Sequence, residues 1–278
     1  MPKTIQVSAA QFNSHPSITE NVQRIRGIVA QAARSGSDAV LFPECALTGY
    51  NIDFRRLSRG DVESGMKAVA TAARDARCHV LIGAPTFERR KCYNSLVLID
   101  RRGRERFRYH KIHLTPRDRE FFSPGNRLAF FRIDSVPCTA IICHERRYPE
   151  LVRLPVMLGA QIVFHPNAGR DTRAVSHAKH GGRDGIAVRA FENQVFYVFA
   201  NCVGAQGGGF WSAGDSKIVA PDSRVLALAN NRSERVIHAR LNLNLAGRQY
   251  AREVLTQPAF LRGHWKKILD ACRERMPS

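Results

Sequence analysis

The chain lacks an apolar run long enough to cross a membrane, and its start lacks a signal peptide. None of its apolar stretches approaches the roughly 18 residues that a bilayer span requires. The opening Met-Pro-Lys-Thr-Ile-Gln has none of the basic, apolar and small-residue zones of a secretory signal. These absences predict a cytoplasmic protein with no membrane partner.

Paired cysteines are lacking as well. The seven cysteines are odd in number and scattered, without a Cys-x-x-Cys pair, so the sequence predicts neither a disulfide framework nor a zinc site. Two histidine pairs, His110 with His113 and His177 with His180, have no obvious acidic third ligand nearby. We therefore expect no catalytic metal.

Acidic residues are few relative to basic ones. The sequence has 43 Lys and Arg against 24 Asp and Glu, a formal net charge of +19, which raises the question of a nucleic acid partner. The basic residues are spread along the chain, however, and Arg greatly outnumbers Lys, as general codon bias can produce. A dedicated nucleic-acid function is therefore not the favoured prediction.

Strand-like and helix-like segments alternate along the chain, and the 44% hydrophobic content is ample for a core. The patterns predict strands at 5–9, 39–43, 80–83, 139–143, 162–165 and 195–200, with helices between them and an antiparallel hairpin over 95–111. Short strands fill the last third. We expect one α/β domain with mixed sheets over residues 1–257, followed by an arm at 258–278.

Three chemically useful residues follow three predicted strands. Glu44 follows Leu-Phe-Pro, Lys111 follows Phe-Arg-Tyr-His, and Cys143 follows Ile-Ile. If these strands are neighbours, all three side chains leave the sheet near one edge, where α/β proteins bind ligands. An ammonium favours a thiolate, and a carboxylate can remove the thiol proton. The pattern therefore predicts a cysteine nucleophile, although a lone cysteine at a strand end is usually buried packing.

The segments around these residues resemble the signature blocks of a known family. They read Phe42-Pro-Glu44-Cys-Ala-Leu-Thr-Gly-Tyr50, Tyr109-His-Lys111-Ile-His-Leu114 and Ile142-Cys143-His-Glu-Arg-Arg-Tyr-Pro-Glu150. In order and rough spacing they are similar to the three blocks of the carbon–nitrogen hydrolase (nitrilase) superfamily. Further similarity lies at 121–125, 165–167, 189–194 and 200–204.

The resemblance implies a four-layer αββα sandwich of two mixed β-sheets with helices on the outer faces. It implies Glu44 as general base and acid, Lys111 as oxyanion stabiliser and Cys143 as nucleophile, with no cofactor. A second acid before the Pro-Gly turn is expected at Glu120, with Asp118 as the alternative. A homodimer or larger assembly is also implied, with the arm at a subunit interface.

The substrate pocket is less clearly defined by the sequence. We expect His144, Arg147 and Asn167 to contact substrate, although His144 could instead turn to solvent, and the backbone N–H of His144 is the expected second oxyanion donor. Arg146 and Arg147 suit an acidic substrate, although at least one of them could instead be solvated at the surface. The predicted reaction is hydrolysis of a small amide or N-carbamoyl compound through a thioester, with release of ammonia. The alternatives are nitrile hydrolysis and a non-catalytic basic binding protein on the same scaffold.

Overall fold

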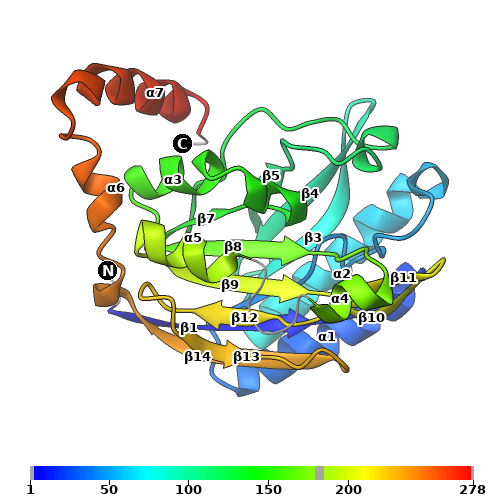
Figure 1. The fold of residues 1–278 in the computed structure, drawn as a ribbon. Coiled ribbons are helices and arrows are strands. Elements are labelled where there is room, and N and C mark those ends of the chain that lie inside the picture. Colours follow the sequence, from blue (N-terminus) through cyan, green and yellow to red (C-terminus); the bar gives the residue numbers. More distant parts are fainter. Residues whose placement is uncertain (1–2, 179–184, 277–278) are drawn as a thin grey trace.

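Two six-stranded β-sheets pack face to face in the computed structural model, which describes residues 3–178 and 185–276 (Figure 1). The first sheet has the order β14 (Arg235–Asn242), β1 (Thr4–Gln11), β2 (Ala39–Leu41), β3 (His79–Glu88), β4 (Lys91–Ile99) and β5 (Glu105–His110). The second has the order β13 (Val225–Leu228), β12 (Lys217–Val219), β9 (Phe196–Asn201), β8 (Ile162–Asn167), β7 (Val136–Ala140) and β6 (Phe131–Ile133).

Both sheets are mixed. The central pairs β1–β2–β3 and β7–β8–β9 are parallel, and the flanking pairs are antiparallel. Parallel neighbours bring their carboxyl ends to the same sheet edge, so the residues that follow β7 and β8 of the second sheet lie close together.

Alternating side chains divide each sheet between two hydrophobic layers. In β2, Ala39 and Leu41 point into the core between the sheets, whereas Val40 packs under the helices. In β8, Ile162 and Phe164 face the same central core, and Val163 faces outward.

Helices cover both outward faces. Those on the first sheet are α1 (Ile18–Arg34) and α2 (Arg59–Ala76), and those on the second are α3 (Glu150–Met157) and α5 (Ile186–Asn193). The predicted αββα sandwich is confirmed.

Local sequence signals account for several element ends. The Ser17 hydroxyl accepts the Glu20 backbone N–H at 3.3 Å at the start of α1, as the capping pattern predicts. Gly36 follows that helix with a φ of +77°, a left-handed conformation that glycine adopts without strain. Pro149 is the residue immediately before α3, where its fixed φ suits a helix start.

The glycine-rich segment at 204–209 has regular structure. It forms most of a hairpin between β10 (Val203–Gly207) and β11 (Phe210–Ala213), with a register shift between Ala205 and Gly207. Three successive glycines, Gly207 to Gly209, have positive φ angles, which allows the tight reversal at the tip.

The carboxyl-terminal arm leaves the sandwich after α6 (Gln249–Glu253) and ends in α7 (Arg262–Glu274) (Figure 1). Leu269 of α7 is buried, and Trp265 packs against the same apolar cluster that underlies α3. Phe260 remains 76% exposed. The place of this arm at a subunit interface stays a prediction.

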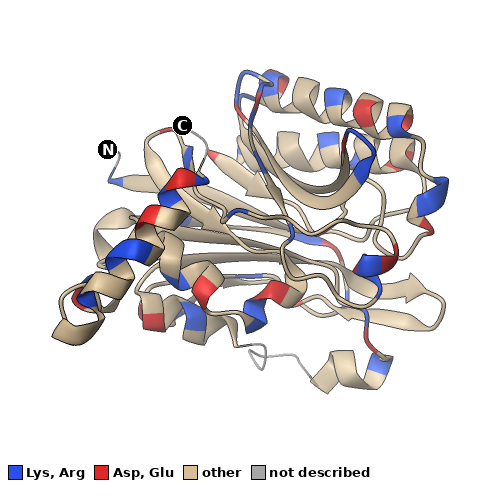
Figure 2. Cartoon of the chain, turned by 90° about the horizontal axis from the view of Figure 1, so that it is seen from above, with Lys and Arg blue, Asp and Glu red and all other residues tan. Residues whose placement is uncertain are grey.

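Basic and acidic residues are interspersed over the surface helices rather than gathered by sign (Figure 2). Many form pairs on the surface, such as Arg59 with Glu63 at 2.7 Å and Arg224 with Asp222 at 2.7 Å. Within the described residues, no helix combines the length and the apolar character needed to cross a bilayer.

Candidate active site

Three chain segments from the two sheets converge beside the core. Glu44 lies two residues beyond Phe42, which continues β2, and Lys111 directly follows β5 of the same sheet. Cys143 comes from the second sheet, three residues after β7, and opens a short 3-10 helix, η3 (Cys143–Arg147). The predicted neighbourhood of these three residues is therefore reproduced across the two sheets, and not along a single sheet edge.

Lys111 lies between two carboxylates and has no exposed side-chain surface. Its Nζ donates to Glu44 Oε1 at 2.7 Å and to Asp118 Oδ2 at 2.8 Å. Burial alone would lower the pKa of Lys111, but the charges of Glu44, Cys143 and Asp118 outweigh it and hold this pKa well above its usual value. The residue is a permanent cation, and two of its three N–H donors are used by described residues.

Glu44 is held on both oxygens. Besides Lys111, Oε1 accepts the Asn94 Nδ2 amide at 2.8 Å, and Oε2 accepts the Ala168 backbone N–H at 3.1 Å. Burial raises the pKa of Glu44, although Lys111 opposes this. A raised pKa lies nearer to neutral pH, which suits a carboxyl group that must take a proton and return it.

The Cys143 thiol lies within the influence of the Glu44 carboxylate. Burial, together with the negative charge of Glu44, raises the pKa of this thiol to about 12 even though Lys111 lowers it. The thiol is therefore protonated at neutral pH, and attack through sulfur requires a base. Glu44 is the candidate for that base.

The backbone at Cys143 has a left-handed conformation, with a φ of 51°, which is rare for a non-glycine residue. The Cys143 carbonyl oxygen lies 3.1 Å from His165 Nε2, and the other ring nitrogen of His165 contacts the Tyr197 hydroxyl at 3.0 Å. Burial lowers the pKa of His165 to about 3, so this ring is neutral and can donate from one nitrogen and accept at the other.

A cavity of about 460 Å³ opens on Cys143. All three predicted substrate residues, His144, Arg147 and Asn167, lie in its wall. Tyr50 also lines the cavity, and its hydroxyl donates to Asp118 Oδ1 at 2.9 Å. Tyr50 therefore connects the cavity wall to the buried cluster around Lys111.

The two alternatives for the auxiliary acid are separated by the geometry. Asp118 is buried, contacts Lys111 and accepts the Thr115 hydroxyl at 2.9 Å, whereas Glu120 is exposed and is not part of this cluster. Both belong to the 3-10 helix η2 (Asp118–Glu120), where residues two apart point in different directions. We therefore move the auxiliary acid from Glu120 to Asp118.

Separate amide substitutions of Asp118 and Glu120 give a matched pair of variants. We expect Asp118→Asn to lower kcat by about 10- to 100-fold, because it removes one charged acceptor that fixes Lys111. Glu120→Gln is expected to change kcat by less than about two-fold, since an exposed surface side chain is altered. Steady-state ammonia release measures both, and a larger loss in Glu120→Gln would contradict this assignment.

Sequence reasoning did not identify Glu145 or Asn94 as parts of the site. Glu145 is fully buried, and burial raises its pKa to about 7, although the N–H group of Ile142 and the charge of Lys111 oppose this. Its position two residues after the nucleophile was visible in the sequence, but three of its four partners are backbone N–H groups, which a sequence pattern does not display. Asn94 lies in the middle of β4 without any motif.

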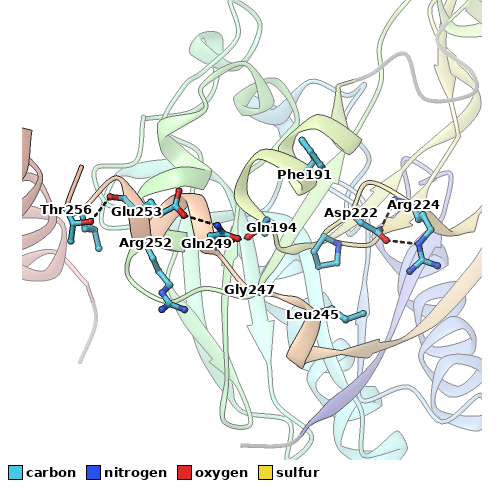
Figure 3. Close-up of a pocket in the computed structure, with 12 residues that line it drawn as sticks. Phe191, Gln194, Asp222, Arg224, Leu245, Gly247, Gln249, Arg252, Glu253 and Thr256 are labelled. Atoms are coloured by element: carbon cyan, nitrogen blue, oxygen red, sulfur yellow. Dashed lines mark hydrogen bonds and ion pairs between the residues drawn. The ribbon is translucent and has the colours of Figure 1, made fainter. Parts of the chain in front are cut away.

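A larger cavity of about 990 Å³ lies between the β12–β13 turn and the segment around α6 (Figure 3). Its described lining includes Phe191 and Leu245, and its polar groups are already engaged, as in the Asp222–Arg224 pair. Glu44, Lys111 and Cys143 are not among its lining residues. The chemistry therefore belongs to the smaller cavity.

No group of three or more potential metal ligands occurs among residues 3–178 and 185–276. Of the two histidine pairs, His180 lies outside the described residues. His110 contacts Glu88 and the Ser95 hydroxyl, at 2.9 and 2.8 Å.

The carbon–nitrogen hydrolase family profile matches residues 6–251. The chain belongs to this family. It is 29% identical to a nitrilase of Pyrococcus abyssi over 86% of this chain and 91% of that protein. It is 32% identical to an (R)-stereoselective amidase of Pseudomonas sp. over 74% of this chain and 73% of that protein.

The fold is shared with a nitrilase-superfamily amidase of known structure. The amidase from Nesterenkonia sp. AN1 superposes with a TM-score of 0.81 at 21% identity, over 94% of this chain and 96% of the other. In that structure the active-site cysteine carries the acetamide moiety of fluoroacetamide. As a carbon–nitrogen hydrolase, the present protein is an enzyme that acts on non-peptide carbon–nitrogen bonds.

Proposed function

We propose that this enzyme hydrolyses the amide or N-carbamoyl group of a small, carboxylate-bearing molecule through a thioester on Cys143. The observation that carries the proposal is the buried Glu44–Lys111–Asp118 cluster, with its 2.7 and 2.8 Å contacts, beside a thiol that opens on a cavity. The cluster combines a base, a fixed cation and a nucleophile at one point.

The first half-reaction forms the thioester. The Cys143 sulfur attacks the carbonyl carbon while its proton passes to Glu44, and the carbonyl oxygen becomes an oxyanion. The third N–H of Lys111 and the backbone N–H of His144 stabilise that negative charge. When the intermediate collapses, the carbon–nitrogen bond breaks and Glu44 returns the proton to the departing ammonia.

The second half-reaction uses the same groups in reverse. Glu44 removes a proton from water, and the resulting hydroxide attacks the thioester carbon. The carbon–sulfur bond then breaks, and the proton held by Glu44 returns to the Cys143 sulfur. Asp118 acts by fixing Lys111. One amide and one water are consumed, and one acid and one ammonia are released.

The charge of the cavity supports a substrate with a carboxylate. Only two aspartates line the cavity in the part of the chain that the structure describes, so basic residues outnumber acidic ones in its wall. The four arginines are Arg117, Arg146, Arg147 and Arg170. Among the described residues no carboxylate forms an ion pair with Arg146 or Arg147. Burial and the charge of Arg147 also lower the pKa of His144, so that ring is neutral at pH 7. A guanidinium pairs well with a carboxylate, and we place the substrate's acidic end against these arginines.

Substitution of the arginines tests the substrate class. For an amide that bears a carboxylate, Arg146→Gln and Arg147→Gln are expected to raise KM by about 10- to 100-fold in at least one case, because a charge-assisted contact is lost. For an uncharged amide of the same length, the same variants should leave KM within about two-fold. Equal effects on both substrates would contradict a carboxylate-binding role.

Product analysis separates the reactions that this site can perform. An amide leaves a carboxylic acid and ammonia, an N-carbamoyl compound also releases carbon dioxide, and a nitrile consumes two waters. The similarity to a nitrilase makes nitrile hydrolysis the second candidate. If no compound of the panel releases ammonia while the protein binds RNA in a salt-sensitive manner, the hydrolytic proposal is wrong.

A further inference from the structure

Glu145 is a fully buried carboxylate surrounded by hydrogen-bond donors. Its Oε2 accepts the Ile142 backbone N–H at 2.7 Å. Its Oε1 accepts the Ile112 backbone N–H at 2.7 Å, the His113 backbone N–H at 3.2 Å and the Tyr109 hydroxyl at 2.9 Å. Both carboxylate oxygens therefore accept hydrogen bonds, and each oxygen accepts them from a different segment of the chain.

The two segments carry two of the proposed catalytic groups. Ile142 immediately precedes Cys143 and follows β7 of the second sheet, whereas Ile112 immediately follows Lys111 and β5 of the first sheet. One side chain thus joins the nucleophile's segment to the oxyanion donor's segment across the gap between the sheets. His165 also contacts the Cys143 carbonyl, but it lies on β8, which belongs to the same sheet as β7.

The four contacts favour the ionised form of the Glu145 carboxylate, although burial raises its pKa to about 7. All four partners present a hydrogen to Glu145, so a protonated oxygen or an amide nitrogen at this position would direct a hydrogen against a donor. In Glu145→Gln, the amide oxygen can satisfy only one of the two sides. The amide nitrogen would then face the Ile142 N–H or the N–H groups of Ile112 and His113.

We propose that Glu145 is a positioning residue, which fixes the distance between the Cys143 sulfur and the Lys111 ammonium by binding the backbone beside each. This inference rests on the proposed function, because it assigns Glu145 a role through those two catalytic groups. The left-handed backbone at Cys143 makes such a restraint necessary, since that conformation persists only where neighbouring contacts hold it.

The experiment compares Glu145→Gln with the wild type and with Val29→Ala. Val29 is a buried residue of α1, in the apolar layer between the first sheet and its helices, and its truncation lowers stability without touching Cys143. We expect Glu145→Gln to lower kcat by about 10- to 100-fold with KM within about three-fold. Hydrogen exchange at the Ile142 or Ile112 amide should accelerate, and Val29→Ala should change neither kcat nor this exchange.

A second readout does not depend on a substrate. The rate at which iodoacetamide alkylates Cys143, followed by mass spectrometry of its peptide, should fall by about ten-fold or more in Glu145→Gln, because the thiol moves relative to Glu44. Glu145→Asp should recover part of that rate, since it keeps the charge but has a shorter reach.

The outcomes are distinct for the two proposals. An alkylation rate in Glu145→Gln that is unchanged or faster, with only a lower melting temperature, would overturn the positioning role. If the wild-type protein hydrolyses nothing in the substrate panel while the alkylation rates differ as expected, the proposed function fails and the positioning role of Glu145 stands.

Discussion

Cys143→Ala is expected to lower ammonia release by at least about 10⁴-fold, the scale of loss when a covalent nucleophile is removed from an enzyme. The Cys143 sulfur is the protein atom that forms a covalent bond to the substrate carbon in the proposed reaction. The substitution removes one sulfur from a partly exposed position, so the melting temperature should change little. Turnover is measured on the best substrate of the panel.

Cys272→Ala provides the matched control for Cys143→Ala. Cys272 lies in α7 and is also partly exposed, so it reports any general effect of removing a thiol. We expect this variant to retain wild-type turnover. Iodoacetamide should inactivate the wild type with one label on Cys143. Substantial turnover in Cys143→Ala would mean that sulfur is not the nucleophile.

The sequence predicted a strand before each residue of the triad, although β7 (Val136–Ala140) lies three residues earlier than the predicted 139–143. β2 and β7 are short and largely apolar, whereas β5 alternates Phe107 and Tyr109 with basic residues. The relative placement of the three strands was not visible. β2 and β5 belong to one sheet and β7 to the other, and only long-range pairing decides this.

The supporting groups of the site were harder to predict because they depend on local geometry. The tight turn of η2 directs Asp118 toward Lys111 and leaves Glu120 exposed, which favours Asp118 over Glu120 as the auxiliary acid. Glu145 was visible in the sequence block around Cys143. Its function could not be inferred because three of its four partners are backbone N–H groups, and the pairing of the two segments is decided by the fold.

Lys111→Met is expected to produce the largest loss of stability, about 3 to 5 kcal/mol at pH 7, because it leaves two buried carboxylates without their shared cation. The Lys111 side chain has 0% exposure, as do Glu44 and Asp118. Methionine fills a similar volume, so the loss reports charge and not a cavity. Urea denaturation measures the change in the free energy of unfolding.

The loss of unfolding free energy in Lys111→Met should be smaller at low pH than at neutral pH. In the wild type, burial raises the pKa of Asp118 but the charge of Lys111 outweighs it, so the pKa is lowered and the stabilisation is lost as pH falls through the folded-state value. Without Lys111, burial and mutual repulsion raise the pKa values of Asp118 and Glu44. The variant then loses stability as pH rises through these two raised pKa values. The difference in unfolding free energy between wild type and variant should therefore be smaller at pH 5 than at pH 7.5.

The double variant Lys111→Met/Asp118→Asn separates the stability effect from the chemistry. Replacing one of the two carboxylates with a neutral amide should restore part of the lost free energy of unfolding, since the remaining Glu44 no longer faces a second buried charge. Turnover should stay at least about 10³-fold below wild type, because the oxyanion still lacks its cation. If the double variant recovered turnover together with stability, Lys111 would be a structural counter-ion and the proposed oxyanion role would be wrong.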